Sequence, residues 1–122
     1  MNWKTIRLEL APTEEFPNGS VSRGFLIRVP LNDNWRIDEG ALSSLPERAQ
    51  VRRFWSTEPD QKGRVTRANG HLVLRCAGKP DRLLDLNANL QPGNEVTVVE
   101  EGGAGLPFRV KIFDRGALVL NG

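Results

Sequence analysis

An Asn-Gly pair at positions 69 and 70 separates two stretches, 64–68 and 71–76, in which apolar and polar residues alternate. Both turn residues tolerate the positive φ angles of a two-residue type I′ turn. Such a pair between alternating flanks is the strongest short-range signal of a β-hairpin. The chain is therefore expected to be built from paired antiparallel strands.

The register of this hairpin follows from its turn. Ala68 opposes His71, and four residues further out Arg64 opposes Arg75. Two opposed guanidinium groups are destabilising unless an anion lies between them. We expect a carboxylate of the protein, such as Asp85, to take that place, and an outside ligand is the alternative.

Further strands are predicted wherever apolar residues alternate with polar ones. These segments are 4–10, 24–29, 49–55, 84–86, 95–100 and 106–113. Asp38 is placed to cap one short helix over 39–45, and Pro46 ends it. Pro59, Asp60 and Gly63 indicate a loop before the hairpin, and Pro92-Gly93 a type II turn.

Short strands with closely spaced turns and a single helix favour an all-β fold, a small antiparallel β-barrel formed by one domain over residues 1–122. A β-sandwich is the alternative. Closure is preferred because it removes edge strands. The apolar segment Ala117 to Leu120 is expected to complete the sheet or to pair with a second copy of the chain, which leaves a homodimer open.

Composition argues against a membrane protein. No apolar run approaches the length needed to cross a bilayer, and the first ten residues interleave charges with apolar side chains, unlike a secretory signal. The single cysteine, Cys76, cannot form an internal disulfide, which agrees with a reducing compartment. We therefore expect a cytoplasmic protein with no membrane partner.

The charges are unevenly distributed although the net charge is only +2. Lys and Arg number 5 against 6 Asp and Glu in residues 1–46, 9 against 4 in 47–82, and 3 against 5 in 83–122. The basic middle third could attract an anionic ligand or partner, nucleic acid included, although nucleic acid is not favoured. Folding could also mix these charges with nearby carboxylates into an ordinary surface.

Catalytic patterns are weak. Cys76 falls on the apolar side of the hairpin, where a cysteine is usually a small core residue, and His71 is the only histidine. A metal site with two imidazoles is therefore excluded within one chain. The Asn32-Asp33-Asn34 segment fits a turn better than a calcium loop. We expect no catalytic residues, no metal and no cofactor.

Aromatic residues offer a binding hypothesis. Arg53 and Trp55 share one face of the strand 49–55 and could stack a base or another aromatic ligand. Phe54 and Trp55 cannot both face inward on a regular strand, so one of them is expected at the surface or at a barrel mouth. The residues predicted to bind a ligand are Arg52, Arg53, Trp55, Arg64 and Arg75.

Two resemblances arise at these residues. Residues 51–55, with 92–96 and 108–110, resemble a family of small uncharacterised bacterial proteins, which implies no site residues. Residues 53–56, with 70–74 and 90–96, also resemble the flavin-binding barrel of ferredoxin-reductase-like proteins. That resemblance implies an Arg-x-Tyr-Ser type flavin motif, in which this chain has Trp55 in place of the tyrosine, and it makes flavin the alternative cofactor.

The function expected from the sequence is a non-catalytic β domain that binds a small ligand or a partner through an arginine-rich face. The alternatives are a nucleic-acid-binding barrel, a flavin-binding reductase-like barrel and a structural homodimeric subunit.

Overall fold

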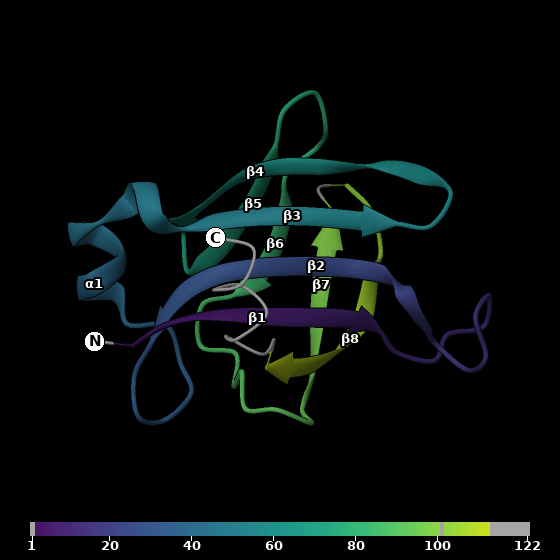
Figure 1. The fold of residues 1–122 in the computed structure, drawn as a ribbon, viewed down its shortest axis with the longest axis horizontal. Helices are drawn as coiled ribbons and strands as arrows, with labels where there is room; N and C mark the ends of the chain where they lie inside the picture. The colour runs from purple at the N-terminus through teal and green to yellow at the C-terminus, as the bar shows by residue number, and fades with distance from the viewer. Residues whose placement is uncertain (1, 101, 113–122) are drawn as a thin grey trace, which may run out of the picture.

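The fold is an eight-stranded antiparallel β-barrel, seen in a computed structural model that describes residues 2–100 and 102–112 (Figure 1). The strands are β1 (Asn2–Leu10), β2 (Ser20–Leu31), β3 (Gln50–Trp55), β4 (Glu58–Ala68), β5 (His71–Cys76), β6 (Arg82–Asp85), β7 (Glu95–Glu100) and β8 (Gly105–Ile112). A short helix, α1 (Glu39–Ser44), and a 3₁₀ turn, η1 (Pro46–Arg48), separate β2 from β3. The predicted all-β barrel is confirmed, and the sandwich alternative was wrong.

Each strand pairs with the next along the chain, and pairing of β1 with β8 closes the barrel. In that closing ladder Ile6 lies opposite Ile112, and Leu10 opposite Phe108. The ladder covers Ile6–Leu10 of β1, so closure pairs that part of the strand along an edge that would otherwise be open. The apolar segment 117–120, predicted to complete the sheet or to pair with a second copy, lies outside the described residues, and the barrel closes without it.

The meander gives the barrel two different ends. The connections that precede β2, β4, β6 and β8 all lie at one end, which we call the mouth. The connections that precede β3, β5 and β7 lie at the other, the closed end. Figure 1 shows α1 at the far left, at the closed end, and the β1–β2 and β3–β4 connections at the right.

Helix α1 covers the closed end. As predicted, Asp38 caps it, with its Oδ1 accepting a hydrogen bond of 3.0 Å from the Ala41 amide. The helix buries Ala41 and Leu42, and Leu86 and Leu90 of the β6–β7 connection are also buried. Neither helical segment in the described ranges has the length and apolar composition needed to cross a membrane.

Alternate residues of the strands fill the barrel interior with apolar side chains. The Phe25 and Phe108 rings meet edge to face with their centroids 5.3 Å apart. Around them lie fully buried aliphatic side chains from six strands: Ile6, Leu8, Ile27, Val65, Leu72, Leu74, Leu84 and Val110. The middle of the barrel is a packed core.

The Asn-Gly hairpin is confirmed in turn and in register. Asn69 and Gly70 have φ angles of 51° and 79°, and Arg64 lies opposite Arg75. The carboxylate beside Arg75 is Asp81 rather than the expected Asp85. Asp81 accepts hydrogen bonds of 3.0 Å from Nε and 2.8 Å from Nη2 of Arg75, because it directly precedes the strand that pairs with β5.

The predicted loop at Pro59, Asp60 and Gly63 was wrong. All three residues belong to β4, because the chain reverses within the two residues that separate β3 from β4. Gly63 is required by packing rather than by a turn. A Cβ atom at this position would lie 1.9 Å from the carbonyl oxygen of Arg75 on β5. The glycine therefore marks a close approach of two strands.

Candidate anion-binding pocket at the barrel mouth

A pocket of about 100 Å³ opens at the barrel mouth, above the packed core. Its walls combine apolar side chains with two arginines and one glutamate. The lining residues are Phe25, Arg53, Trp55, Arg82, Val98, Glu100, Ala104, Leu106 and Phe108. The charged members are the ones a core would not hold, so they define the chemistry of the pocket.

The register of β2 and β3 turns Arg53 into the barrel. Arg53 lies opposite Phe25, and Val51 opposite Ile27, both of which point into the core. The two-residue period of β3 puts Trp55 on the same face as Arg53, and the Arg53 guanidinium carbon lies 4.4 Å from the Trp55 ring centroid. The predicted sharing of one face by Arg53 and Trp55 is confirmed.

Arg82 lies on the same face of β6 as the buried Leu84. Its side chain is only 8% exposed, and its Nη2 lies 3.3 Å from Oε2 of Glu100 on the neighbouring strand. The Nη1 atom is buried and has no hydrogen-bond partner among the described residues. Nη1 carries two of the five N–H donors of a guanidinium, so Arg82 is a nearly buried cation with unused donors at Nη1.

Arg53 is also incompletely satisfied. Its Nη1 donates a 2.9 Å hydrogen bond to Oε1 of Glu58, whose side chain is 42% exposed at the rim. Its Nε is buried and has no partner in the described part of the chain. A buried donor left without an acceptor costs about 1–3 kcal/mol, and more when it is charged. The pocket therefore holds two guanidinium groups that an oxyanion would stabilise.

Aromatic rings and guanidinium groups alternate around the mouth. The Arg23 guanidinium carbon lies 4.3 Å from the Phe16 ring centroid and 5.9 Å from that of Trp55, and Arg82 lies 5.9 Å from Phe25. These contacts hold the arginines against apolar surface with little water around them. An anion entering the pocket would meet them in a medium of low polarity, where charge interactions are strong.

Cys76 lies close to both pocket arginines but is not positioned as a nucleophile. Burial raises the pKa of the Cys76 thiol, and the positive charges of Arg82 and Arg53 offset only part of that rise. The thiol contacts the Gln61 carbonyl oxygen at 3.9 Å. His71 stands at the other end of β5, beside the hairpin turn. The described lining residues of the pocket thus provide charged and apolar groups but no nucleophile beside a base.

The predicted site residues divide between two surfaces. Arg53 and Trp55 meet in the pocket, whereas Arg52, Arg64 and Arg75 point outward from β3, β4 and β5 and lie on the outer wall. Phe54 also faces outward, where the Arg7 guanidinium carbon lies 4.2 Å from its ring centroid. The structure therefore supports two surfaces in place of the one predicted.

Arg82 and Glu100 were missed as site residues. Arg82, Leu84 and Leu86 follow one another at a spacing of two residues, and so do Val96, Val98 and Glu100. In each case a charged residue continues the inward face of an apolar strand. That continuation was the available signal, and it identifies the point where the core ends and the pocket begins.

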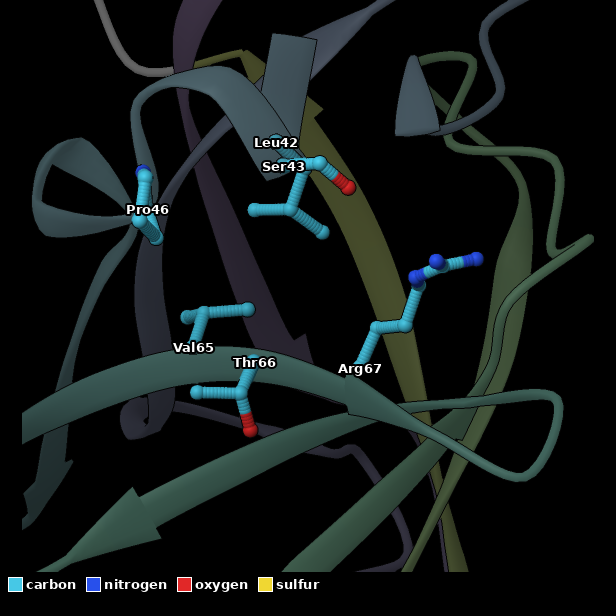
Figure 2. Close-up of a pocket in the computed structure, with 6 residues that line it drawn as sticks. All are labelled: Leu42, Ser43, Pro46, Val65, Thr66 and Arg67. Atoms are coloured by element: carbon cyan, nitrogen blue, oxygen red, sulfur yellow. The ribbon is translucent and has the colours of Figure 1, made fainter. Parts of the chain in front are cut away.

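A second hollow, of about 170 Å³, lies between α1 and β4. Figure 2 shows Leu42, Ser43 and Pro46 facing Val65, Thr66 and Arg67 of β4. Its one cation, Arg67, already forms an ion pair with Glu39 of α1. No buried polar atom without a partner lines this hollow in the described ranges, so we assign the binding chemistry to the mouth.

No group of three or more metal-ligating side chains occurs within residues 2–100 and 102–112. Comparison with known protein families, curated proteins and solved structures finds no match for this chain. What the pocket binds is therefore inferred from its own side chains.

Proposed function

We propose that the protein is a non-catalytic binding domain whose mouth pocket takes the carboxylate head of a small organic anion. The observation that carries the proposal is Arg82, a nearly buried guanidinium with unused donors in a pocket whose other walls are mostly apolar. Mostly apolar walls with one or two placed charges are typical of small-molecule sites. Arg82 and Arg53 supply the N–H donors, and Trp55 with Phe25 packs against the apolar body of the ligand.

The size of the pocket limits the ligand. At about 100 Å³ it is smaller than a 150 Å³ cavity of the kind that binds benzene. A carboxylate with an aliphatic body of a few carbons fits this volume. This volume weighs against burial of a flavin ring system in the pocket, because an isoalloxazine is much larger than benzene. The proposed setting is the cytoplasm, as expected from the single cysteine.

The rim glutamate Glu100 occupies the place where we expect the ligand carboxylate to bind. Its side chain is 48% exposed, and its 3.3 Å ion pair with Arg82 leaves that guanidinium underused. A ligand carboxylate would replace Glu100, which would then turn toward water. Because one carboxylate replaces another, the buried Arg82 guanidinium stays paired with or without the ligand. Neither state then carries the full free-energy cost of an unpaired buried charge.

Thermal unfolding in the presence of added anions tests the proposal. At constant ionic strength, acetate, butyrate, benzoate and phosphate are compared with chloride. A ligand at about 100 times its Kd stabilises the folded state by about 2.7 kcal/mol. We expect butyrate to raise the Tm most, benzoate to be hindered by size, and phosphate to be hindered by the apolar walls. Equal Tm values in all of these salts would overturn the proposal.

Two variants should shift the affinity in opposite directions. Arg82→Met removes the guanidinium and should abolish the butyrate effect, whereas Glu100→Gln removes the competing carboxylate and should tighten binding about fivefold, the equivalent of about 1 kcal/mol. Arg67→Met, the same substitution at the closed end, is the control and should leave the butyrate effect intact. If Arg82 only closes the mouth as a structural element, Glu100→Gln will destabilise the protein without improving anion binding.

A further inference from the structure

A separate basic face covers the outer wall of the barrel. It consists of Arg28 on β2, Arg52 on β3, and Lys62 and Arg64 on β4, all of them exposed. We call these four residues the outer basic face. They point away from the core, so they share no wall with the mouth pocket.

Strand pairing places these cations side by side. Arg52 lies directly opposite Lys62, and Arg28 and Arg64 lie on either side of Gln50 in one row across the sheet. The same row continues to Arg75 on β5. Neighbouring strands are about 4.8 Å apart, and alternate residues along a strand about 7 Å apart, so the backbone positions of the four residues fall within roughly 12 Å of one another.

No carboxylate within the described ranges forms an ion pair with this face. Arg52, Lys62 and Arg64 form no ion pair with any described residue, and Arg28 donates only to the Thr5 hydroxyl, at 3.3 Å. Arg75, at the end of the row, differs because Asp81 binds it through two hydrogen bonds.

The opposite wall of the barrel is balanced. There Arg109 pairs with Glu95, and Lys111 pairs with Glu9 at 2.8 Å. Like charges directly opposed across two strands are destabilising. The outer basic face therefore tolerates repulsion that the opposite wall avoids, which is the arrangement expected where an anionic partner supplies the missing charge.

We propose that the outer basic face binds the phosphate backbone of a nucleic acid without reading its sequence. Three of its four cations are arginines, whose planar forks match phosphate oxygens. A nucleic-acid strand carries about one phosphate per 3.4 Å of its axis, so about three to four phosphates lie along the roughly 12 Å that the four cations span.

The face lacks what base recognition would need. The nearest outward aromatic ring on β3, Phe54, is stacked against Arg7 and is not free to receive a base.

A membrane is a poorer fit as partner. Stable membrane attachment usually combines basic residues with a second, apolar signal. The large exposed apolar side chains of the described residues are Val21, Leu106 and Ile112, and none of them lies on β3 or β4.

Binding of fluorescent oligonucleotides at increasing salt tests this proposal. Four phosphate contacts predict a slope of log K against log salt of about −2.8 for single strands, which is 0.7 times four. Affinity should therefore fall about 50-fold between about 50 and 200 mM salt. A duplex probe distinguishes the two forms of nucleic acid, because its slope should be nearer −3.6.

Variants distinguish binding at the outer basic face from an effect of the protein's net charge. The double substitution Arg52→Gln with Arg64→Gln should halve the slope, so that affinity falls only about sevenfold over the same range. Arg52→Lys with Arg64→Lys keeps the charge and should keep the slope. The control, Arg109→Gln with Lys111→Gln on the opposite wall, removes the same charge and should leave the slope near −2.8.

Three results would overturn the proposal: no oligonucleotide binding at about 50 mM salt, equal loss of affinity in the control and test variants, or tighter binding to anionic phospholipid vesicles than to either oligonucleotide. Failure here is distinguishable from failure of the pocket proposal. Arg82→Met should leave oligonucleotide binding unchanged, and butyrate should not compete with the oligonucleotide.

Discussion

Replacement of Gly63 by alanine should destabilise the barrel strongly. A Cβ atom at this position would lie 1.9 Å from the carbonyl oxygen of Arg75 and 2.8 Å from the Cα of Cys76. Ordinary contact begins at about 3.4 Å. The difference of about 1.5 Å cannot be absorbed by a rotamer change, because both neighbours are backbone atoms, so β4 and β5 would have to separate locally.

The magnitude follows from what that separation breaks. A shift of about 1.5 Å removes the ladder hydrogen bonds beside Gly63, about two of them at roughly 1 kcal/mol each, and overpacking of a well-filled interior costs about 1–3 kcal/mol. We expect the free energy of unfolding to fall by about 3 kcal/mol. For a domain of this size the Tm should fall by about 10 °C.

Urea and thermal unfolding, followed by tryptophan fluorescence and circular dichroism, measure the effect. Gly40→Ala in α1 is the matched control, because the nearest atom to its added Cβ, Oδ1 of Asp38, lies at 3.6 Å. That substitution should stabilise the protein by about 0.5–1 kcal/mol through helix propensity. A Gly63→Ala protein within about 0.5 kcal/mol of the wild type would refute the reasoning.

Two further predictions concern ionisation and helix capping. Burial opposes the charge on Glu9, but the side chains of Lys111 and Arg7 outweigh this effect and hold the pKa of Glu9 below 4.5. Glu9→Gln should therefore lower the free energy of unfolding by about 1 kcal/mol above that pH. Urea unfolding should show that this difference between the two proteins vanishes as the pH falls through the folded-state pKa of Glu9. Asp38→Ala removes the acceptor of the Ala41 amide and should lower the free energy of unfolding by about 1 kcal/mol, whereas Asp38→Ser, which restores an acceptor, should recover most of it.

The strands and turns could be predicted because their signals are local. Asn69-Gly70 determined both the turn and the pairing of Ala68 with His71, and Pro92-Gly93 formed the expected turn, with Gly93 at a φ of 95°. Each of these outcomes depends on the φ angles that a few adjacent residues can adopt. Tertiary context adds little to them.

The prediction errors arose where contacts with residues far away in the sequence decide the local structure. Pro59 and Gly63 carry loop-like propensities, yet both lie in β4, and the reason for Gly63 is the backbone of β5, which no local pattern reports. The conformation of Trp35 was not predicted at all. This residue adopts a φ of 62°, a region that favours glycine, within a turn that Asn32 holds through hydrogen bonds to the amides of Asn34 and Arg36.

The candidate site was half predicted. The two-residue period of β3 placed Arg53 beside Trp55 correctly. The same period puts Arg52 on the opposite face from Arg53, but it could not show which of these faces turns into the barrel or that Arg64 lies on the same outer wall as Arg52. Assignment of Arg82 to the site depends on the pairing of β6 with β7, which makes Glu100 its neighbour and which the sequence did not reveal.

Because of the strand order, closure of the barrel depends on one ladder, that between β1 and β8. Seven of its eight ladders join consecutive strands, and only that between β1 and β8 joins segments about a hundred residues apart. A substitution that disrupts only the β1–β8 ladder would leave an open sheet in which the other seven ladders are intact. Its two edge strands, β1 and β8, would expose unpaired backbone amides and carbonyls. Damage to this ladder would therefore lead to self-association before it led to loss of secondary structure.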